Sequence, residues 1–257
     1  MDETEELIRL CARACVAMIS EAPTFELRMT RNSVLALSGE PVADLNMLFV
    51  GPSPDAEDFL TQGLTRVRER QLPLLAMMSP HVAQRLAPVA EGLGLTAAGT
   101  APLMVLRADT PVLPSRPCDI RRALGPELVR ISGDLSSAAF SLPRDCVARC
   151  MDAGITETAG VETYVAWAED VPMSAVTVTP AGTTAGIWSM ATPPEQQGKG
   201  MGRALLTGVI VDYRRRGVER FFLIATEAGR PLYASLGFEV VADFSAWVLG
   251  HSTQVHS

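Results

Sequence analysis

The chain has 257 residues, of which 47% are hydrophobic and 20% charged, a composition that excludes a disordered chain and is typical of a folded protein with a sizeable core. The formal net charge of −7 excludes the densely basic face that binding to nucleic acid or to an anionic membrane requires. The length exceeds that of an ordinary single domain and fits two.

The N-terminus is acidic and lacks the basic start and apolar run of a signal peptide. No apolar run reaches the roughly 20 residues that span a bilayer. The five cysteines and three histidines offer no set of four metal ligands, so we expect reduced thiols and no bound metal. These features predict a cytoplasmic protein with neither a nucleic acid nor a membrane as partner, and they are compatible with a homo-oligomer.

A proline-rich segment divides the chain. Residues 110–117 contain three prolines, which disfavour a helix and a central strand. We therefore predict a linker at 113–117 between a first domain, 1–112, and a second domain, 118–250, with a short tail at 251–257.

Hydrophobic periodicity in the second domain alternates between strand and helix patterns. The apolar residues of 201–216 recur every three to four positions, and Gly217 supplies a stop signal. The order predicts a mixed α/β domain with a mixed sheet. Its expected elements are a strand at 118–122, helices at 133–140 and 144–151, strands at 161–169, 173–179 and 183–192, a helix at 201–216, a strand at 221–225, a helix at 230–236 and a strand pair at 238–242 and 245–249.

The first half of the chain shows a weak likeness to the second. Residues 89–95 parallel 232–238, and each segment precedes a closing strand, at 103–106 and 246–249. Upstream, the strand-like residues 45–50 parallel 187–192, and prolines follow both. We interpret these parallels as an internal duplication.

A glycine-rich turn between a predicted strand and a predicted helix carries the chemistry. Glycines at 198, 200 and 202 remove side chains that would keep phosphate oxygens from the amides of the helix N-terminus, and Lys199 and Arg203 can add charge. A Walker loop would need serine or threonine where Gly200 stands, and a dinucleotide fingerprint would need glycine where Arg203 stands. Both alternatives fail at a specific position.

The remaining pattern, Gln-x-x-Gly-x-Gly over 197–202, resembles the coenzyme A loop of the GNAT superfamily of acetyltransferases. A second segment, Tyr233-Ala-Ser-Leu-Gly-Phe238, is similar to that superfamily's Tyr-x-x-Leu-Gly-Phe signature. The resemblance covers 118–250. It implies the acyl-coenzyme A N-acyltransferase fold, and the duplication then predicts two tandem copies of it.

The resemblance also implies a cofactor and a site. Acetyl-coenzyme A would be the co-substrate, no metal would be needed, and Tyr233 would act as general acid toward the departing thiolate. Free backbone groups at the end of the strand before the loop would pair with the pantetheine arm. The implied cofactor-binding residues are Met190, Ala191, Thr192, Gln197, Gly198, Lys199, Gly200, Met201, Gly202, Arg203 and Thr226.

The chain departs from the family at several positions. Some relatives carry a glutamate base in mid-strand where Gly186 stands here, and Thr226 replaces a frequent asparagine. Among nearby carboxylates we assign no base. In the first half, Ala90 takes the tyrosine position and 51–58 has three carboxylates instead of a glycine cradle, so we expect that half to be a degenerate copy without coenzyme A.

The sequence thus predicts transfer of an acetyl group to a primary amine of a small molecule or peptide. An acyl-coenzyme A sensor or scaffold without activity is the alternative, and a larger acyl donor stays open.

Overall fold

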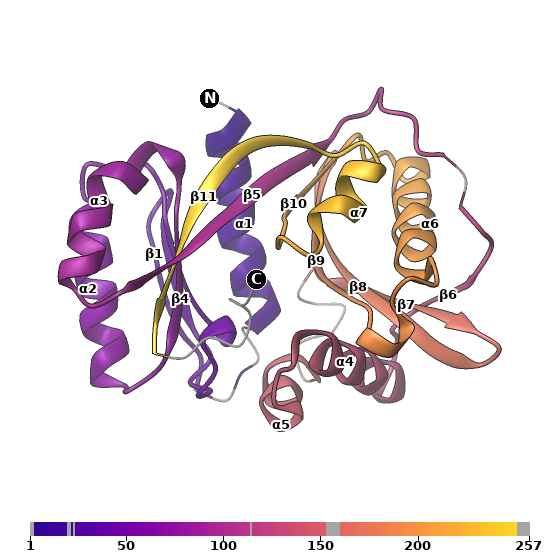
Figure 1. Ribbon diagram of the computed structural model, residues 1–257, viewed down its shortest axis with the longest axis horizontal. Helices are drawn as coiled ribbons and strands as arrows, with labels where there is room; N and C mark the ends of the chain where they lie inside the picture. Colours follow the sequence, from indigo (N-terminus) through magenta and orange to yellow (C-terminus); the bar gives the residue numbers. More distant parts are fainter. Residues whose placement is uncertain (1–2, 20–21, 23, 114, 153–159, 251–257) are drawn as a thin grey trace. The chain divides into compact units, whose positions relative to one another are not determined.

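The computed structural model describes residues 3–19, 22, 24–113, 115–152 and 160–250, so the predicted tail lies outside the described residues. The chain forms two compact units (Figure 1). Unit 1 comprises Met1–Leu103 with Val241–Ser257, and unit 2 comprises Met104–Val240. The chain therefore leaves unit 1 just before the proline-rich segment and returns to it near the C-terminus.

Unit 2 follows the predicted element order. Its helix α4 starts earlier than periodicity indicates, because Pro126 fits the first turn of a helix, where no amide hydrogen is needed. The elements are β6 (Asp119–Arg122), α4 (Pro126–Phe140), α5 (Arg144–Val147), a π-helical turn (Ala148–Asp152), β7 (Glu162–Ala168), β8 (Val171–Ala181), β9 (Thr184–Ala191), a 3-10 turn (Pro194–Gln196), α6 (Met201–Arg215), β10 (Arg220–Ile224) and α7 (Arg230–Ser235).

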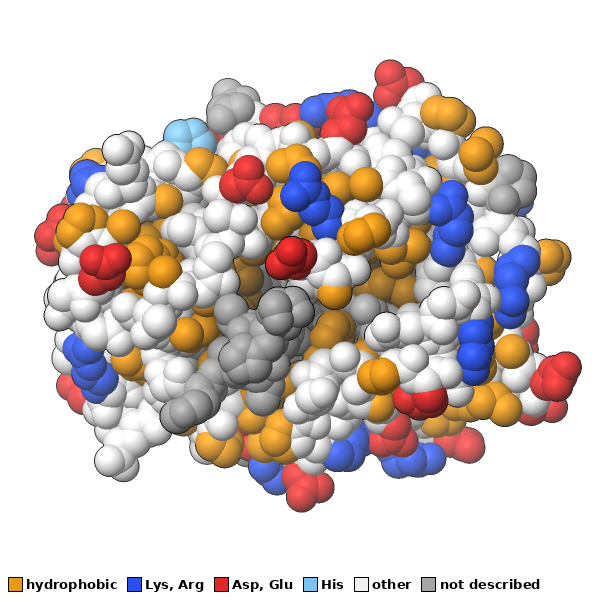
Figure 2. All heavy atoms as spheres, viewed as in Figure 1, with side chains coloured by type: hydrophobic (Ala, Val, Ile, Leu, Met, Phe, Trp, Pro, Cys, Tyr) orange, Lys and Arg blue, Asp and Glu red, His pale blue; other side chains and the backbone are white. Residues whose placement is uncertain are grey.

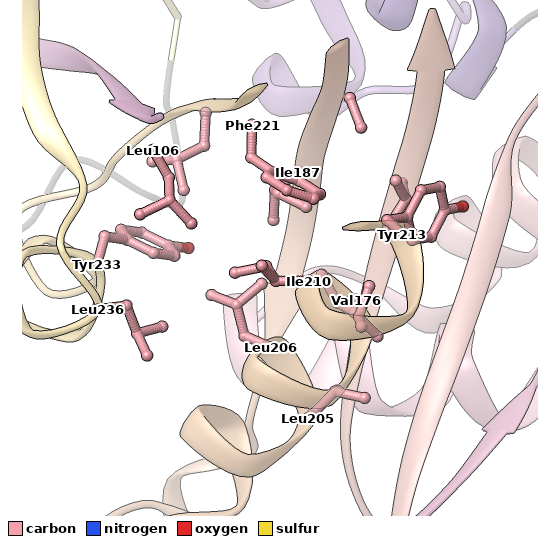
Figure 3. Packing of buried hydrophobic residues seen from close by; sticks show 14 of the residues in the cluster. Leu106, Val176, Ile187, Leu205, Leu206, Ile210, Tyr213, Phe221, Tyr233 and Leu236 are labelled. Carbon is pink, nitrogen blue, oxygen red and sulfur yellow. The ribbon is translucent and has the colours of Figure 1, made fainter. Parts of the chain in front are cut away.

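The strands of unit 2 lie in the order β10-β9-β8-β7-β6, with β10 and β9 parallel and the other pairs antiparallel. Alternation along β7 places helices on both faces. Tyr164 and Ala166 belong to the core that α6 covers, whereas Val165 and Trp167 pack with Leu135 of α4. Figure 3 labels other members of the core under α6, among them Val176, Leu206 and Ile210. The sheet thus lies between two helical layers.

Unit 1 begins with α1 (Glu3–Ile19), β1 (Glu26–Met29) and β2 (Val34–Leu37). It continues through β3 (Asn46–Val50), α2 (Ala56–Glu69), β4 (Leu74–Met78) and α3 (Pro80–Gly92). Its last strands are the start of β5 (Thr96–Leu106) and most of β11 (Glu239–Leu249). In Figure 1, α2 and α3 lie together on one side of its strands and α1 on the other.

The two units share a pairing pattern, which supports the interpretation of an internal duplication. In unit 1, β2 and β3 are antiparallel and β3 and β4 parallel, as β8, β9 and β10 are in unit 2. The fold is mixed α/β in two tandem copies. Among the described helices, none is long and apolar enough to cross a membrane.

The predicted strand pair at 238–242 and 245–249 is wrong. Residues 239–249 form the single strand β11, whose C-terminal part pairs antiparallel with β4 of unit 1, Trp247 opposite Ala76. Asp243 suggests a turn, but the next residue, Phe244, is fully buried and packs edge-on against Phe49, with ring centroids 5.5 Å apart. Burying this ring keeps the chain extended through the expected turn.

One ion-pair cluster joins β7 to the end of α6. Glu162 accepts hydrogen bonds from Arg216 at 2.8 and 2.9 Å and from the Tyr164 hydroxyl at 2.6 Å. The Arg216 guanidinium also lies over the Tyr213 ring, 4.2 Å from its centroid. These interactions lower the pKa of Glu162 to about 2, and the hydrogen bond from Arg216 is the largest cause.

We expect Glu162→Gln to lower the free energy of unfolding by about 1 kcal/mol at pH 7, since it removes a partly exposed, charge-assisted contact. A depressed folded-state pKa stabilises above the unfolded value and loses that effect as pH falls toward the folded value. The difference from the wild type should therefore be full above about pH 5 and fade toward pH 2. Urea titrations across this range measure it. The exposed Glu239→Gln is the control, and a difference independent of pH would contradict the assigned cause.

Candidate functional site

Strands β9 and β10 part midway along the sheet of unit 2. Their pairing runs from Thr184 opposite Arg220 to Gly186 opposite Phe222, while β9 continues to Ala191. A bulge in β9 lies beyond the last pair, because two residues of β8 there span three of β9. Within the bulge Ser189 has φ of +46°, a conformation that L residues seldom adopt. Beyond Gly186, β9 therefore continues without a pairing partner in β10.

The end of β9 carries three of the predicted cofactor residues. Ala191 is buried, and its carbonyl accepts a hydrogen bond from the buried Ser174 hydroxyl at 2.7 Å. The Thr192 carbonyl accepts one from the Gln197 side chain at 3.0 Å. Met190 is half-buried against the core under α6. With these carbonyls engaged, a pantetheine arm would pair with the other backbone groups of this edge.

The glycine-rich turn adopts the backbone that its composition predicts. Gly198 and Gly200 have φ of +73° and +75°, where a side chain would be strained. Helix α6 begins immediately after Gly200, without a capping side chain and without an acidic residue in its first turn. Its first amides therefore have no anionic side chain of their own to bind. The turn has the features of an anion site.

Gly202 brings the first turn of α6 against the end of β9. A Cβ atom there would lie 3.0 Å from the Thr192 hydroxyl and 3.1 Å from the terminal methyl of Met190. The Thr192 hydroxyl is itself 2.8 Å from that of Ser174. A larger residue at 202 would push the helix N-terminus away from the strand. The sequence does not predict this role of Ser174, since nothing in its local pattern distinguishes it from other strand residues.

The two basic residues of the turn have neutral partners. Lys199 donates to the side-chain oxygen of Gln196 at 2.8 Å. Arg203 donates to the hydroxyl of Ser235 on α7 at 2.5 Å and to its carbonyl at 3.1 Å. Arg203 therefore ties the start of α6 to α7, a contact that the sequence did not predict.

Tyr233 lies on α7, the short helix that follows β10. Its side chain is 8% exposed, and its ring packs edge-on against Phe238 at 5.9 Å between centroids. In Figure 3 it points from α7 toward Ile210 of α6. Burial raises the pKa of Tyr233 to about 12, so its hydroxyl stays protonated at neutral pH and can donate a proton.

Thr226 is exposed at the turn between β10 and α7. Its hydroxyl accepts a hydrogen bond from the Gly229 amide at 3.1 Å, which shapes the turn that leads into α7. The position thus serves the local backbone, and the ligand contact predicted for it stays a prediction.

The mid-strand position of a base is filled by an aromatic ring. A Cβ atom on Gly186 would lie 2.6 Å from the indole nitrogen of Trp188 and 2.9 Å from the Phe222 ring. The same indole donates to the Thr179 hydroxyl at 2.7 Å. Of the carboxylates in this region of the sequence, Glu162 and Asp134 are held by arginines, and Glu169 and Glu195 are exposed. No base is assigned to any of them.

The corresponding turn of unit 1 is built differently. A Cβ atom on Gly51 would lie 2.2 Å from the Asn32 carbonyl, so a neighbouring strand connection closes over the turn. Glu57 and Asp58 occupy the first turn of α2, and Ala90 is buried in α3. These carboxylates already balance the positive end of the helix.

Within the described part of the chain, no three His, Cys, Asp or Glu side chains form a group that could hold a metal. Cys11, Cys118, Cys146 and Cys150 form no disulfide. On the face shown in Figure 2, acidic and basic side chains are interspersed.

Comparisons with known proteins agree with this geometry. Residues 159–240 match the family model of the acetyltransferase (GNAT) domain. The fold is similar to that of a GCN5-related N-acetyltransferase from Kribbella flavida, with a TM-score of 0.68 and 16% identity over 94% of this chain and 96% of that one. A GCN5-related N-acetyltransferase from Sphaerobacter thermophilus has a similar fold, with a TM-score of 0.62 and 18% identity over 87% of this chain and 83% of that one.

A tandem GNAT protein from the clavulanic acid biosynthesis pathway gives a TM-score of 0.58 and 16% identity over 97% of this chain and 94% of that one. No curated protein sequence matches the chain. The family match lies within unit 2, around the parted strands, the glycine-rich turn and Tyr233, and the shared fold extends over both units. Residues 159–240 therefore match the acetyltransferase (GNAT) domain family, and the fold of the chain as a whole is similar to that of GCN5-related N-acetyltransferases.

Proposed function

We propose that unit 2 transfers an acetyl group from acetyl-coenzyme A to a primary amine of a small molecule or peptide. The observation that carries the proposal is the coincidence of the parted strands with the uncapped N-terminus of α6 and the protonated Tyr233. The amides of the first turn would bind the pyrophosphate, and the edge of β9 would bind the pantetheine arm.

In the reaction, the neutral amine nitrogen attacks the thioester carbonyl carbon and forms a tetrahedral intermediate. The carbon–sulfur bond then breaks, and the leaving thiolate takes the hydroxyl proton of Tyr233. The amine loses its extra proton to water, because Trp188 fills the position of a mid-strand base. Positioning supplies the larger part of the rate. Unit 1 lacks such a turn and would bind no cofactor of its own.

For Tyr233→Phe we expect kcat to fall by about a hundredfold or more, the range of general acid catalysis, with the Kd for coenzyme A changed less than about twofold. Since the pKa of Tyr233 is about 12, the wild-type rate should show no decline from this group up to pH 10. Steady-state kinetics across this pH range measures kcat, and calorimetry measures the Kd for coenzyme A.

Tyr164→Phe makes the same chemical change in the same unit and removes one hydrogen bond to Glu162, so it serves as the matched control. Equal loss of turnover and affinity in Tyr233→Phe, or loss of neither, contradicts the general-acid role.

Gly202→Val tests the glycine-rich turn. The new side chain would meet Thr192 and Met190 and displace the amides of the first turn, so affinity for coenzyme A should fall at least about tenfold, as for the loss of one charge-assisted hydrogen bond. The control is Ala228→Val at an exposed turn position. Unchanged affinity in a folded Gly202→Val protein would rule out this turn as the phosphate site.

An acyl-coenzyme A sensor is the alternative, and the missing mid-strand carboxylate favours it. A panel of amino acids, polyamines, aminoglycosides and peptide amines, each with acetyl-coenzyme A, separates the two by release of free thiol. We expect release that depends on one class of amine. Tight binding of acetyl-coenzyme A without release by any acceptor would favour the sensor, and release only with longer acyl chains would revise the donor.

A further inference from the structure

The segment between β5 and β6, residues 107–113 and 115–118, lies along α6; we refer to it as the strap. At one end, Arg214 in the last turn of α6 donates to the carbonyls of Arg107 and Thr110, each at 2.9 Å. At the other end, a guanidinium nitrogen of Arg116 lies 2.7 Å from the sulfur of Met201, the first residue of α6. The strap is therefore fixed at both ends of the helix.

The strap is short and rich in proline. The prolines at 111, 114 and 117 of the sequence favour an extended chain. The backbone of Arg116 lies close enough to the first turn of α6 for its side chain to contact Met201.

Arg116 is close to the glycine-rich turn and has spare donors. Its Cδ atom lies 4.0 Å from the place of a Cβ atom on Gly200. Its side chain is exposed, and its contact with Met201 is with a thioether, which is a weak acceptor. A guanidinium has five N–H donors, so most of them remain able to bind an anion.

The charges around the first turn of α6 favour the binding of an anion. Arg116, Lys199 and Arg203 each lie within or beside the turn at the positive end of the α6 dipole, and their hydrogen-bond partners there are neutral. The residues from 193 to 203 contain a single carboxylate, Glu195. Three cations at a helix N-terminus repel one another and the dipole until an anion binds. Such a concentration of positive charge contrasts with the net charge of −7 of the whole chain.

We propose that Arg116 binds a phosphate of the acyl-coenzyme A donor, so that the strap forms one wall of the phosphate site. The inference rests on the proposed function and adds to it a residue outside both sequence motifs and outside the 159–240 family match. Arg116 would recognise the phosphates and not the thioester, because it stands at the helix N-terminus, beside Gly200 and Met201.

The test compares three probes on the folded, full-length protein by calorimetry or by competition. Coenzyme A carries phosphates and pantetheine, adenosine 3′,5′-bisphosphate carries phosphates alone, and pantetheine carries none. For Arg116→Gln we expect the affinities for coenzyme A and for the bisphosphate to fall about tenfold, as for one charge-assisted contact. The affinity for pantetheine should stay within about twofold, and the deficit should shrink at high salt.

Two further variants complete the design. Arg116→Lys keeps the charge and should recover part of the loss, and Arg215→Gln removes an exposed arginine at the opposite end of α6 and should match the wild type. Unchanged coenzyme A affinity in Arg116→Gln overturns the inference. An equal loss for all three probes overturns it as well, because the strap would then act only on the fold. If the wild-type protein binds none of the probes, the proposed function itself is wrong.

Discussion

The parting of β9 from β10 is the constraint on which the rest of the site depends. Backbone groups beyond Gly186 and Phe222 lose their sheet partners there, and such groups are costly to leave unpaired unless water or a ligand binds them. Ser189 takes a left-handed conformation within the bulge that β9 forms against β8. Unpaired backbone groups along a strand edge can bind an extended chain that carries amides.

The position of the proposed phosphate site follows from the same strand. The turn is fixed to the end of β9 by the Gln197 side chain and by the close approach of Gly202 to Thr192, while Ser174 holds the strand end from β8. The backbone edge of β9 and the N-terminus of α6 are therefore held together at this corner of the fold. A donor that satisfies both must carry an anion at one end of an extended arm, which is the shape of an acyl-coenzyme A.

Local signals predicted the elements of this corner, and non-local packing determined the rest. Gly198, Gly200 and Gly237 all adopt positive φ, as turn chemistry predicts, and Tyr233 lies on the expected short helix. The sequence around Ser189 did not predict the bulge, because the bulge arises from the register between β9 and β8. The sequence predicts a turn between two strands next to Phe244, but the Phe244 ring is buried against Phe49, which lies nearly 200 positions earlier in the chain. Arg116 falls within the predicted linker. Its contact with Met201 could not be predicted, because the two residues are 85 positions apart in the sequence.

The two copies share the frame of the fold, and we propose an anion site in only one of them. Both copies bury the same pairing pattern of strands, so selection for a core preserves it in each. The helix N-termini differ. In α2, Glu57 and Asp58 neutralise the dipole permanently, whereas α6 has neither a capping side chain nor an acid in its first turn and is flanked by cations. A helix whose positive end is satisfied internally has no use for a phosphate. A helix left uncapped beside Lys199 and Arg203 gains stability only when an anion arrives, so ligand binding and the order of the first turn should be coupled.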